Sequence, residues 1–166
     1  MLYRLFEKDG GIARAARSPI PDRRDAVGRA VSEAEDRQDI ADLLVRYATG
    51  IDRRDWALFR TVFTHDCELD YGEIGAWHGV DAVTEFMDTT HAPAGHTLHR
   101  LTNQVIAVDG DDGSARTYVD AVIMFGDNQS GVNACGFYDD EVVRTAEGWR
   151  VARRRFTSVR VAAFGA

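Results

Sequence analysis

The sequence has few cysteines and no long apolar run, and each shortage excludes a class of protein. Its two cysteines, Cys67 and Cys135, form no C-x-x-C pair. This pattern disfavours a disulfide scaffold or a zinc ribbon and is typical of a reduced, cytoplasmic protein; a disulfide between the two is the less favoured alternative. No stretch of about 18 apolar residues occurs, so we expect no membrane span. Charges interrupt the first apolar residues, so we expect no signal peptide.

The absence of certain motifs and of excess positive charge argues against three further kinds of function. The formal net charge of −7 argues against a nucleic-acid partner. Without a G-x-S-x-G motif, acyl transfer is disfavoured. His91, His96 and His99 lie close together but form neither H-x-H nor H-E-x-x-H. Residues three apart on a strand face opposite ways. We therefore expect no metal, and we expect His91 and His96 to be loop residues at a cavity mouth.

What is present suffices for one domain and an N-terminal extension. The 166 residues are 45% hydrophobic and include eight Phe, five Tyr and three Trp, enough for a core or a lined cavity. Residues 1–34 hold two of the three prolines and mixed charges. They are predicted to form an arm, with a short helix and a proline-containing linker, before a domain of residues 35–166. The arm could pack on a neighbouring subunit, but a solvated extension is favoured.

The segment from Asp36 to Trp56 is predicted to be an amphipathic helix that ends in a polar turn. One apolar stripe repeats at spacings of three and four and comprises Ile40, Leu43, Leu44, Tyr47 and Ile51. The Tyr47 hydroxyl and the Asp52 carboxylate are therefore delivered toward the same interior. Taken alone, Asp52 is better interpreted as the N-cap of a following helix, over residues 53–63.

The remaining pattern places helices first and strands last. A strand over 66–71 and a hairpin return over 73–78 precede a helix over 79–90. Long strands are then predicted over 96–108, 114–125, 132–144 and 149–161, and the first two are joined by the turn residues Asp-Gly-Asp-Asp-Gly. Segregated helices and strands indicate an α+β fold with a curved antiparallel sheet.

Several residues, in order, make the chain resemble the SnoaL-like branch of the nuclear transport factor and ketosteroid isomerase superfamily. They are Tyr47-x4-Asp52, Asp55-Trp56, Asp70-Tyr71, Gly79, His99-x3-Asn103, Gly136-x-Tyr138-x-Asp140 and Gly148-Trp149-Arg150. The resemblance spans about residues 34–160 and looks closest to scytalone dehydratase, bile-acid 7α-dehydratase and lindane dehydrochlorinase. It implies a cone-shaped sheet closed by helices around a cavity, and a homo-oligomer, dimer or trimer.

The resemblance also implies a cofactor-independent lyase or isomerase. His99 would be the base, Asp52 would fix its tautomer, and Tyr47 would be the acid or electrophile. By the same mapping Tyr71 would contact substrate, and Arg154 would anchor an anionic group. A second histidine of scytalone dehydratase maps near Phe125, so a two-histidine mechanism is not expected.

Other interior positions are predicted from alternation and from apolar character. If His99 faces inward, so should Asn103 and Val105, and Asn103 would then add a polar group to the pocket. The apolar lining candidates include Trp56, Phe86 and Phe137. Such a lining would suit an apolar cyclic, polyketide, terpenoid or steroid-type molecule. The alternatives are core roles for Tyr47 and His99, a non-catalytic ligand-binding or assembly subunit like that of ring-hydroxylating dioxygenases, and an epoxide hydrolase.

Overall fold

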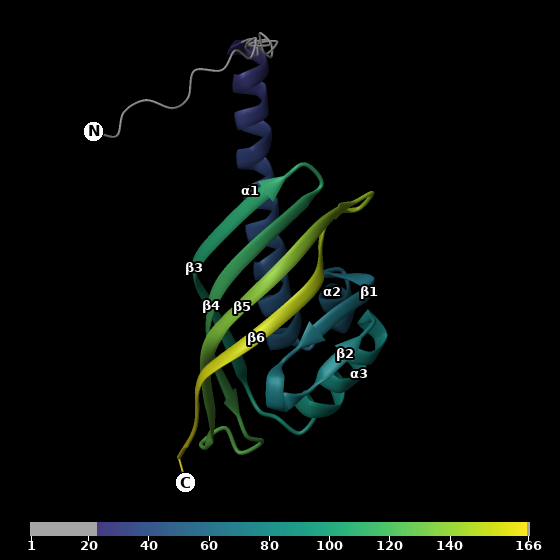
Figure 1. Ribbon diagram of the computed structural model, residues 1–166. Helices are drawn as coiled ribbons and strands as arrows, with labels where there is room; N and C mark the ends of the chain where they lie inside the picture. The colour runs from purple at the N-terminus through teal and green to yellow at the C-terminus, as the bar shows by residue number, and fades with distance from the viewer. Residues whose placement is uncertain (1–22, 166) are drawn as a thin grey trace, which may run out of the picture.

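The computed structural model describes residues 23–165, which form helices packed on one mixed sheet (Figure 1). The helices are α1 (Arg23–Arg53), α2 (Trp56–Arg60) and α3 (Val80–His91), with a 3-10 turn over Gly72–Ile74. The strands are β1 (Phe63–Asp70), β2 (Ala76–His78), β3 (Thr97–Asp109), β4 (Asp112–Met124), β5 (Gly131–Thr145) and β6 (Gly148–Phe164). The predicted α+β class is thereby confirmed.

The six strands pair in the order β2-β1-β6-β5-β4-β3. Strands β3 to β6 form the predicted antiparallel meander, whereas β1 pairs in parallel with β6. The described sheet is therefore mixed, with the expected antiparallel meander and one parallel pair. The parallel pair arises because the chain returns from the end of the meander alongside β1, in the same direction. Strands β2 and β3 lie at the two edges, so the described sheet is curved but not closed.

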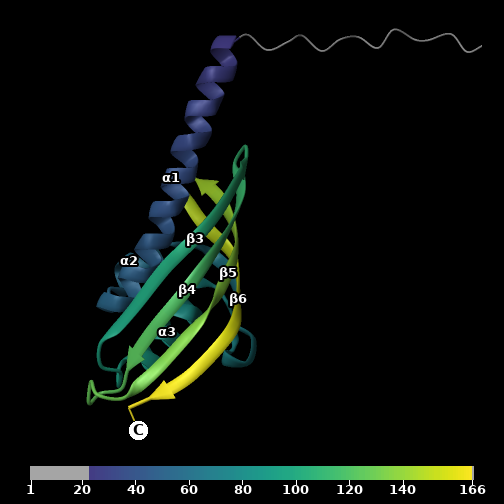
Figure 2. The ribbon, with the colours of Figure 1, turned by 90° about the vertical axis from the view of Figure 1, so that its left-hand side faces the viewer.

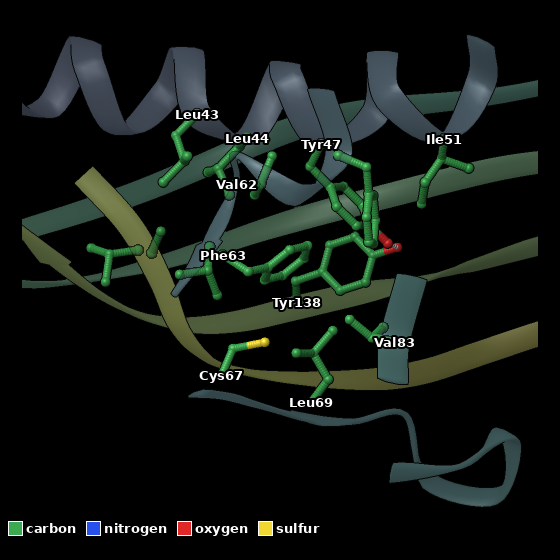
Figure 3. Close-up of a cluster of buried hydrophobic side chains, with 14 of the residues drawn as sticks. Leu43, Leu44, Tyr47, Ile51, Val62, Phe63, Cys67, Leu69, Val83 and Tyr138 are labelled. Atoms are coloured by element: carbon green, nitrogen blue, oxygen red, sulfur yellow. Dashed lines mark hydrogen bonds between the residues drawn. The ribbon is translucent and has the colours of Figure 1, made fainter. Parts of the chain in front are cut away.

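Helix α1 covers one face of the sheet (Figure 2). Every member of its apolar stripe is at most 1% exposed, so the predicted buried side is confirmed. Figure 3 shows Leu43, Leu44, Tyr47 and Ile51 pointing from α1 into the layer that Phe63 and Tyr138 fill from the sheet side. This layer is the core of the domain, and it brings Tyr47 against the inner face of the sheet.

The helix starts earlier than the sequence indicated. Because α1 begins at Arg23 and is continuous to Arg53, the predicted linker cannot extend to residue 34. The helix continues past the end of the sheet in both views (Figures 1 and 2). Its contact with the sheet includes Asp36, which accepts a hydrogen bond from Trp149 Nε1 at 3.2 Å and pairs with Arg144 at 2.6 Å. The predicted arm upstream of Arg23 lies outside the described residues.

Strand β3 changes the face that it presents to the helix partway along its length. Thr97, His99 and Leu101 are partly buried, but after the irregularity between Thr102 and Val105 the partly buried residues are Ile106 and Val108. Asn103 has φ 48° and is exposed, and Val105 is 68% exposed. The prediction that both face the interior was wrong, because a bulge shifts the alternation of side chains by one residue.

The opposite face of the sheet carries charged side chains and a groove. A groove of about 970 Å³ is lined by residues of all six strands, among them Arg116, Asp139 and Arg153. Phe137 also lies on this face. Its ring centroid is 5.9 Å from that of exposed Tyr118 and 4.7 Å from the guanidinium carbon of Arg116. The prediction that Phe137 lines the interior was therefore wrong. The neighbouring residue, Tyr138, faces inward instead.

Candidate active site

A carboxylate at the end of α1 holds a histidine from the start of β3. His99 Nδ1 donates to Asp52 Oδ1 at 2.7 Å, and the backbone N–H of His99 donates to Asp52 Oδ2 at 2.9 Å. An ionised carboxylate only accepts hydrogen bonds, so the Nδ1 proton is fixed and the neutral ring keeps Nε2 as a free acceptor. Among residues 32–165, whose side chains the structure describes, Nε2 makes no hydrogen bond. The two side chains are 7% and 20% exposed, so the pair is sheltered but reachable.

The alternative role of Asp52 as a helix cap is not what the structure shows. The N-cap of α2 is Asp55, whose side chain accepts from Leu58 N at 2.9 Å. Both oxygens of Asp52 are instead directed at His99. Burial raises the pKa of Asp52, but the hydrogen bonds from the ring and backbone of His99 outweigh this and leave the pKa below its ordinary value. Asp52 is therefore ionised at neutral pH.

A defined backbone motif ends α1 directly after Asp52. Helix α1 closes with Asp55 N bonded to Gly50 O at 2.8 Å and Arg54 N bonded to Ile51 O at 3.0 Å, the two bonds of a Schellman motif. Arg54 has φ 54°, the left-handed conformation that this motif requires after the last helical turn. Gly50 permits the close approach of Phe59, whose backbone atoms lie 3.0 Å from where a Cβ would stand. The last turn of α1 therefore packs closely against α2.

Three tyrosines meet in the interior beside the pair. The Tyr47 hydroxyl is 3.0 Å from that of Tyr71 and 3.3 Å from that of Tyr138, and the Tyr47 ring lies edge-on to the His99 ring at 6.3 Å. Burial is the largest cause of a raised pKa for all three phenols, so they are protonated at neutral pH. Each of the two hydroxyl–hydroxyl hydrogen bonds uses one of the three hydroxyl protons, so one O–H remains free to donate to another group. The cluster can therefore act as a hydrogen-bond donor.

An ion pair lies directly beneath this tyrosine cluster. Arg154 donates to both oxygens of Asp140 at 2.7 and 2.8 Å, and both side chains are 0% exposed. The guanidinium also lies over the rings of Tyr47 at 4.0 Å and Tyr138 at 4.3 Å. Arg154 thus faces inward, but Asp140 already neutralises its charge. Its Nη1 has no partner within the described part of the chain.

The two remaining aromatic candidates lie around α3. Trp56 Nε1 donates to Asp88 at 2.7 Å, and the Trp56 ring is 6.1 Å from that of His91. The Phe86 ring packs on Trp77 with centroids 4.2 Å apart. Both candidates are only partly buried and flank the interior, without entering the tyrosine cluster. Of these two residues, Trp56 lies at the same end of the domain as His91, whose ring it contacts.

His91 belongs to the helix and is not a loop residue as predicted. It is the last residue of α3 and is buried, with Nδ1 donating to Met87 O at 2.8 Å. Burial lowers its pKa, so the ring is neutral near pH 7. His96 is exposed in the segment before β3. Where side chains are described, over residues 32–165, no cluster of three or more His, Cys, Asp or Glu side chains could hold a metal ion.

Sequence reasoning missed three residues at this site. Tyr138 and Asp140 belong to a matched motif, Gly136-x-Tyr138-x-Asp140, and this motif was the available signal. Arg54 carried no signal, because its contacts are all with backbone carbonyls, at His91, Ala94 and Gly95.

Comparison with known proteins identifies the family. A model of the SnoaL-like domain matches residues 32–155. The chain belongs to the SnoaL-like family. An uncharacterized protein of Mycobacterium tuberculosis is 35% identical over 126 residues, which cover 75% of this SnoaL-like chain and 86% of that protein. No helix in the described residues is long and apolar enough to cross a membrane.

Solved structures share this SnoaL-like architecture. A proposed aromatic ring hydroxylase from Novosphingobium aromaticivorans has a TM-score of 0.73 and 32% identity, covering 79% of this chain and 94% of its own. A proposed scytalone dehydratase from the same organism has a TM-score of 0.70 and 19% identity, covering 86% of this chain and 93% of its own. A hexachlorocyclohexane dehydrochlorinase has a TM-score of 0.72 and 18% identity, covering 84% of this chain and 93% of its own. At these identities the last two show the common fold, and the neighbours of the family therefore include enzymes.

Proposed function

We propose that this SnoaL-like protein is a cofactor-independent lyase or isomerase of the dehydratase type. The observation that carries the proposal is the Asp52–His99 pair, in which two hydrogen bonds of 2.7 and 2.9 Å fix the ring and leave Nε2 without a partner. A histidine held in one tautomer by a carboxylate is a suitable general base. The dehydratase and dehydrochlorinase neighbours support this class of reaction.

The proposed reaction begins with proton abstraction by His99. Nε2 takes a proton from a carbon next to an activating group, and the C–H electron pair forms a carbon–carbon double bond as hydroxide or halide departs. In an isomerisation the same pair instead moves toward a substrate oxygen, and the imidazolium returns the proton to another carbon. Asp52 stabilises the imidazolium in either case, because its pKa is lowered and it stays ionised.

The tyrosine cluster would donate a hydrogen bond to an oxygen of the substrate. Its one unshared O–H can donate to a carbonyl, an enolate or a departing hydroxyl group, with Tyr47 central and Tyr71 beside it. The Arg154 guanidinium packs over the Tyr47 and Tyr138 rings, and its charge is already balanced by Asp140. With Trp56 and Phe86 as apolar neighbours, the proposed substrate is a small apolar cyclic, polyketide, terpenoid or steroid-like molecule.

The test is turnover on compounds found by screening hydroxylated and ketonic members of these classes. His99→Gln and Asp52→Asn should lower kcat by roughly 10²–10⁴-fold, the usual contribution of general acid–base catalysis. His96→Gln is the matched control, because His96 is an exposed histidine three residues from His99. Full activity of both dyad variants, with the fold retained, contradicts the proposed role of the pair.

A second candidate function is a non-catalytic ligand-binding or assembly subunit. The observation that favours it is the packing of the interior, where Tyr47 is 1% exposed and Arg154 and Asp140 are fully enclosed. The groove of about 970 Å³ lies on the opposite face of the sheet from α1. For this function, His99→Gln and Asp52→Asn should leave ligand affinity unchanged, and no compound in the screen should be turned over.

We also propose that the protein forms a homo-oligomer, a dimer or a trimer. Apolar side chains are exposed on β3, β4 and β6, including Val105, Tyr118, Val159 and Val161. Exposed apolar side chains on the strands of a sheet favour a partner surface. Analytical ultracentrifugation over a hundredfold range of concentration tests this, and a monomer throughout would contradict it.

A further inference from the structure

Arg54 links the end of α1 to the segment that leads into β3. Its side chain donates from Nε to His91 O at 3.2 Å and from Nη2 to Ala94 O at 3.0 Å and Gly95 O at 2.5 Å. His91 is the last residue of α3, where helical carbonyls lack partners within the helix. The guanidinium therefore caps α3 and holds the segment after it at the same time.

The position of Arg54 in the chain is unusual for its conformation. Residue 54 is the left-handed residue of the Schellman motif, with φ 54°. Glycine is the usual residue there, because it alone adopts this conformation without a steric cost from Cβ. An observed outlier of this kind supports a functional hypothesis when the side chain makes contacts that glycine could not make. The three carbonyl contacts of Arg54 are of that kind.

The contacts of Arg54 lie close to those of the Asp52–His99 pair, both at the end of α1 and before β3. Asp52 lies two residues before Arg54 and binds His99, and Gly95 lies four residues before His99 and is bound by Arg54. Between these points the chain joins the sheet, with Gly95 N bonded to Met124 O at 2.9 Å. The helix end and the strand start are thus fastened at two places, one by Asp52 and one by Arg54.

We propose that Arg54 is a positioning residue that sets the geometry of the Asp52–His99 pair. This inference rests on the proposed function, because positioning matters only if the pair acts as a base. The guanidinium fixes where β3 starts relative to the last turn of α1, so that His99 Nδ1 meets Asp52 at hydrogen-bonding distance. Without it, the segment from 91 to 96 loses three side-chain hydrogen bonds to the end of α1.

The test is NMR of the His99 ring in ¹⁵N-labelled protein, which needs no substrate. In the wild type the Nδ1–H proton should give a downfield resonance protected from exchange, assigned by its absence in His99→Gln. Arg54→Gly and Arg54→Ala should lose this resonance through exchange with solvent. Arg53→Ala is the matched control, since Arg53 is the adjacent exposed arginine and its removal changes the net charge equally.

Arg54→Gly separates the side chain from the backbone, because glycine suits the left-handed position and keeps the Schellman motif. Circular dichroism and cooperative unfolding establish that each variant is folded. Loss of the resonance in folded Arg54→Gly, with retention in Arg53→Ala, supports the positioning role. An unchanged resonance in Arg54→Gly and Arg54→Ala overturns this role and leaves the proposed function standing. A wild type without the resonance overturns the dyad, and with it both proposals.

Discussion

Replacing Arg154 alone should destabilise the domain far more than replacing Arg154 and Asp140 together. Their two hydrogen bonds, at 2.7 and 2.8 Å, join side chains that are both fully enclosed. Arg154→Met leaves the Asp140 carboxylate buried without a counter-charge, and Asp140→Leu leaves the guanidinium in the same state. A double substitution removes both charges and fills similar volume with apolar atoms.

The magnitudes separate the outcomes clearly. Removing one partner of a buried ion pair costs roughly 3–5 kcal/mol, so two independent effects would sum to about 6–10 kcal/mol. Replacing a buried pair with apolar residues is often close to neutral, so the double variant should lie within about 2 kcal/mol of the wild type. The guanidinium also lies over the Tyr47 and Tyr138 rings, so Arg154→Met should be the more costly single change.

The assay is urea unfolding at pH 7, followed by tryptophan fluorescence and far-UV circular dichroism. The matched control is the neighbouring pair Arg116–Asp139, which has the same bidentate geometry on the exposed face of β4 and β5. Solvent screens that pair, so Arg116→Met should change the midpoint little. Additive losses in the double Arg154 and Asp140 variant would falsify the argument from buried charge.

Three further predictions concern the site and the core. Because the Asp52 pKa is lowered in the folded state, the stability that Asp52 contributes is present above its unfolded pKa and is lost as pH falls through the folded value. The difference in unfolding free energy between wild type and Asp52→Asn should therefore shrink only below about pH 4. Gly50→Ala should cost roughly 1–3 kcal/mol, measured in urea, because its Cβ would stand 3.0 Å from Phe59 backbone atoms; an unchanged midpoint would contradict this. Burial raises the pKa of Cys67 to about 11, so a thiol reagent at pH 8 should modify partly exposed Cys135 well before Cys67; equal rates in the native protein would refute it.

Much of the fold follows from periodicity in the sequence. The stripe on α1 is fully buried as predicted, and the four strands of the meander lie within a few residues of their predicted bounds. Both outcomes depend only on which residues are apolar and on their spacing. The pairing of Asp52 with His99 came from the family resemblance, since periodicity cannot bring residues 47 positions apart together.

Alternation shows that neighbouring residues face opposite ways, but it does not say which one faces the core. Phe137 and Tyr138 are both aromatic, and only the register of β5 turns Tyr138 inward and leaves Phe137 beside Arg116. A one-residue bulge at Asn103 reversed the faces of β3 beyond Thr102, although the local sequence has no glycine or proline to mark it.

Strand β6 carries three consecutive arginines, and alternation turns the middle one to the opposite face from its two neighbours. Cross-strand register places Arg154 opposite Asp140, and this pairing makes the middle arginine a neutralised part of the core. Arg54 could not be assigned from sequence at all, because it binds carbonyl groups that every residue carries. The sequence by itself determined which elements form and which sides are apolar. Tertiary structure decided which polar groups meet, because burial removes water as their partner and leaves only what register and chain reversal place within reach.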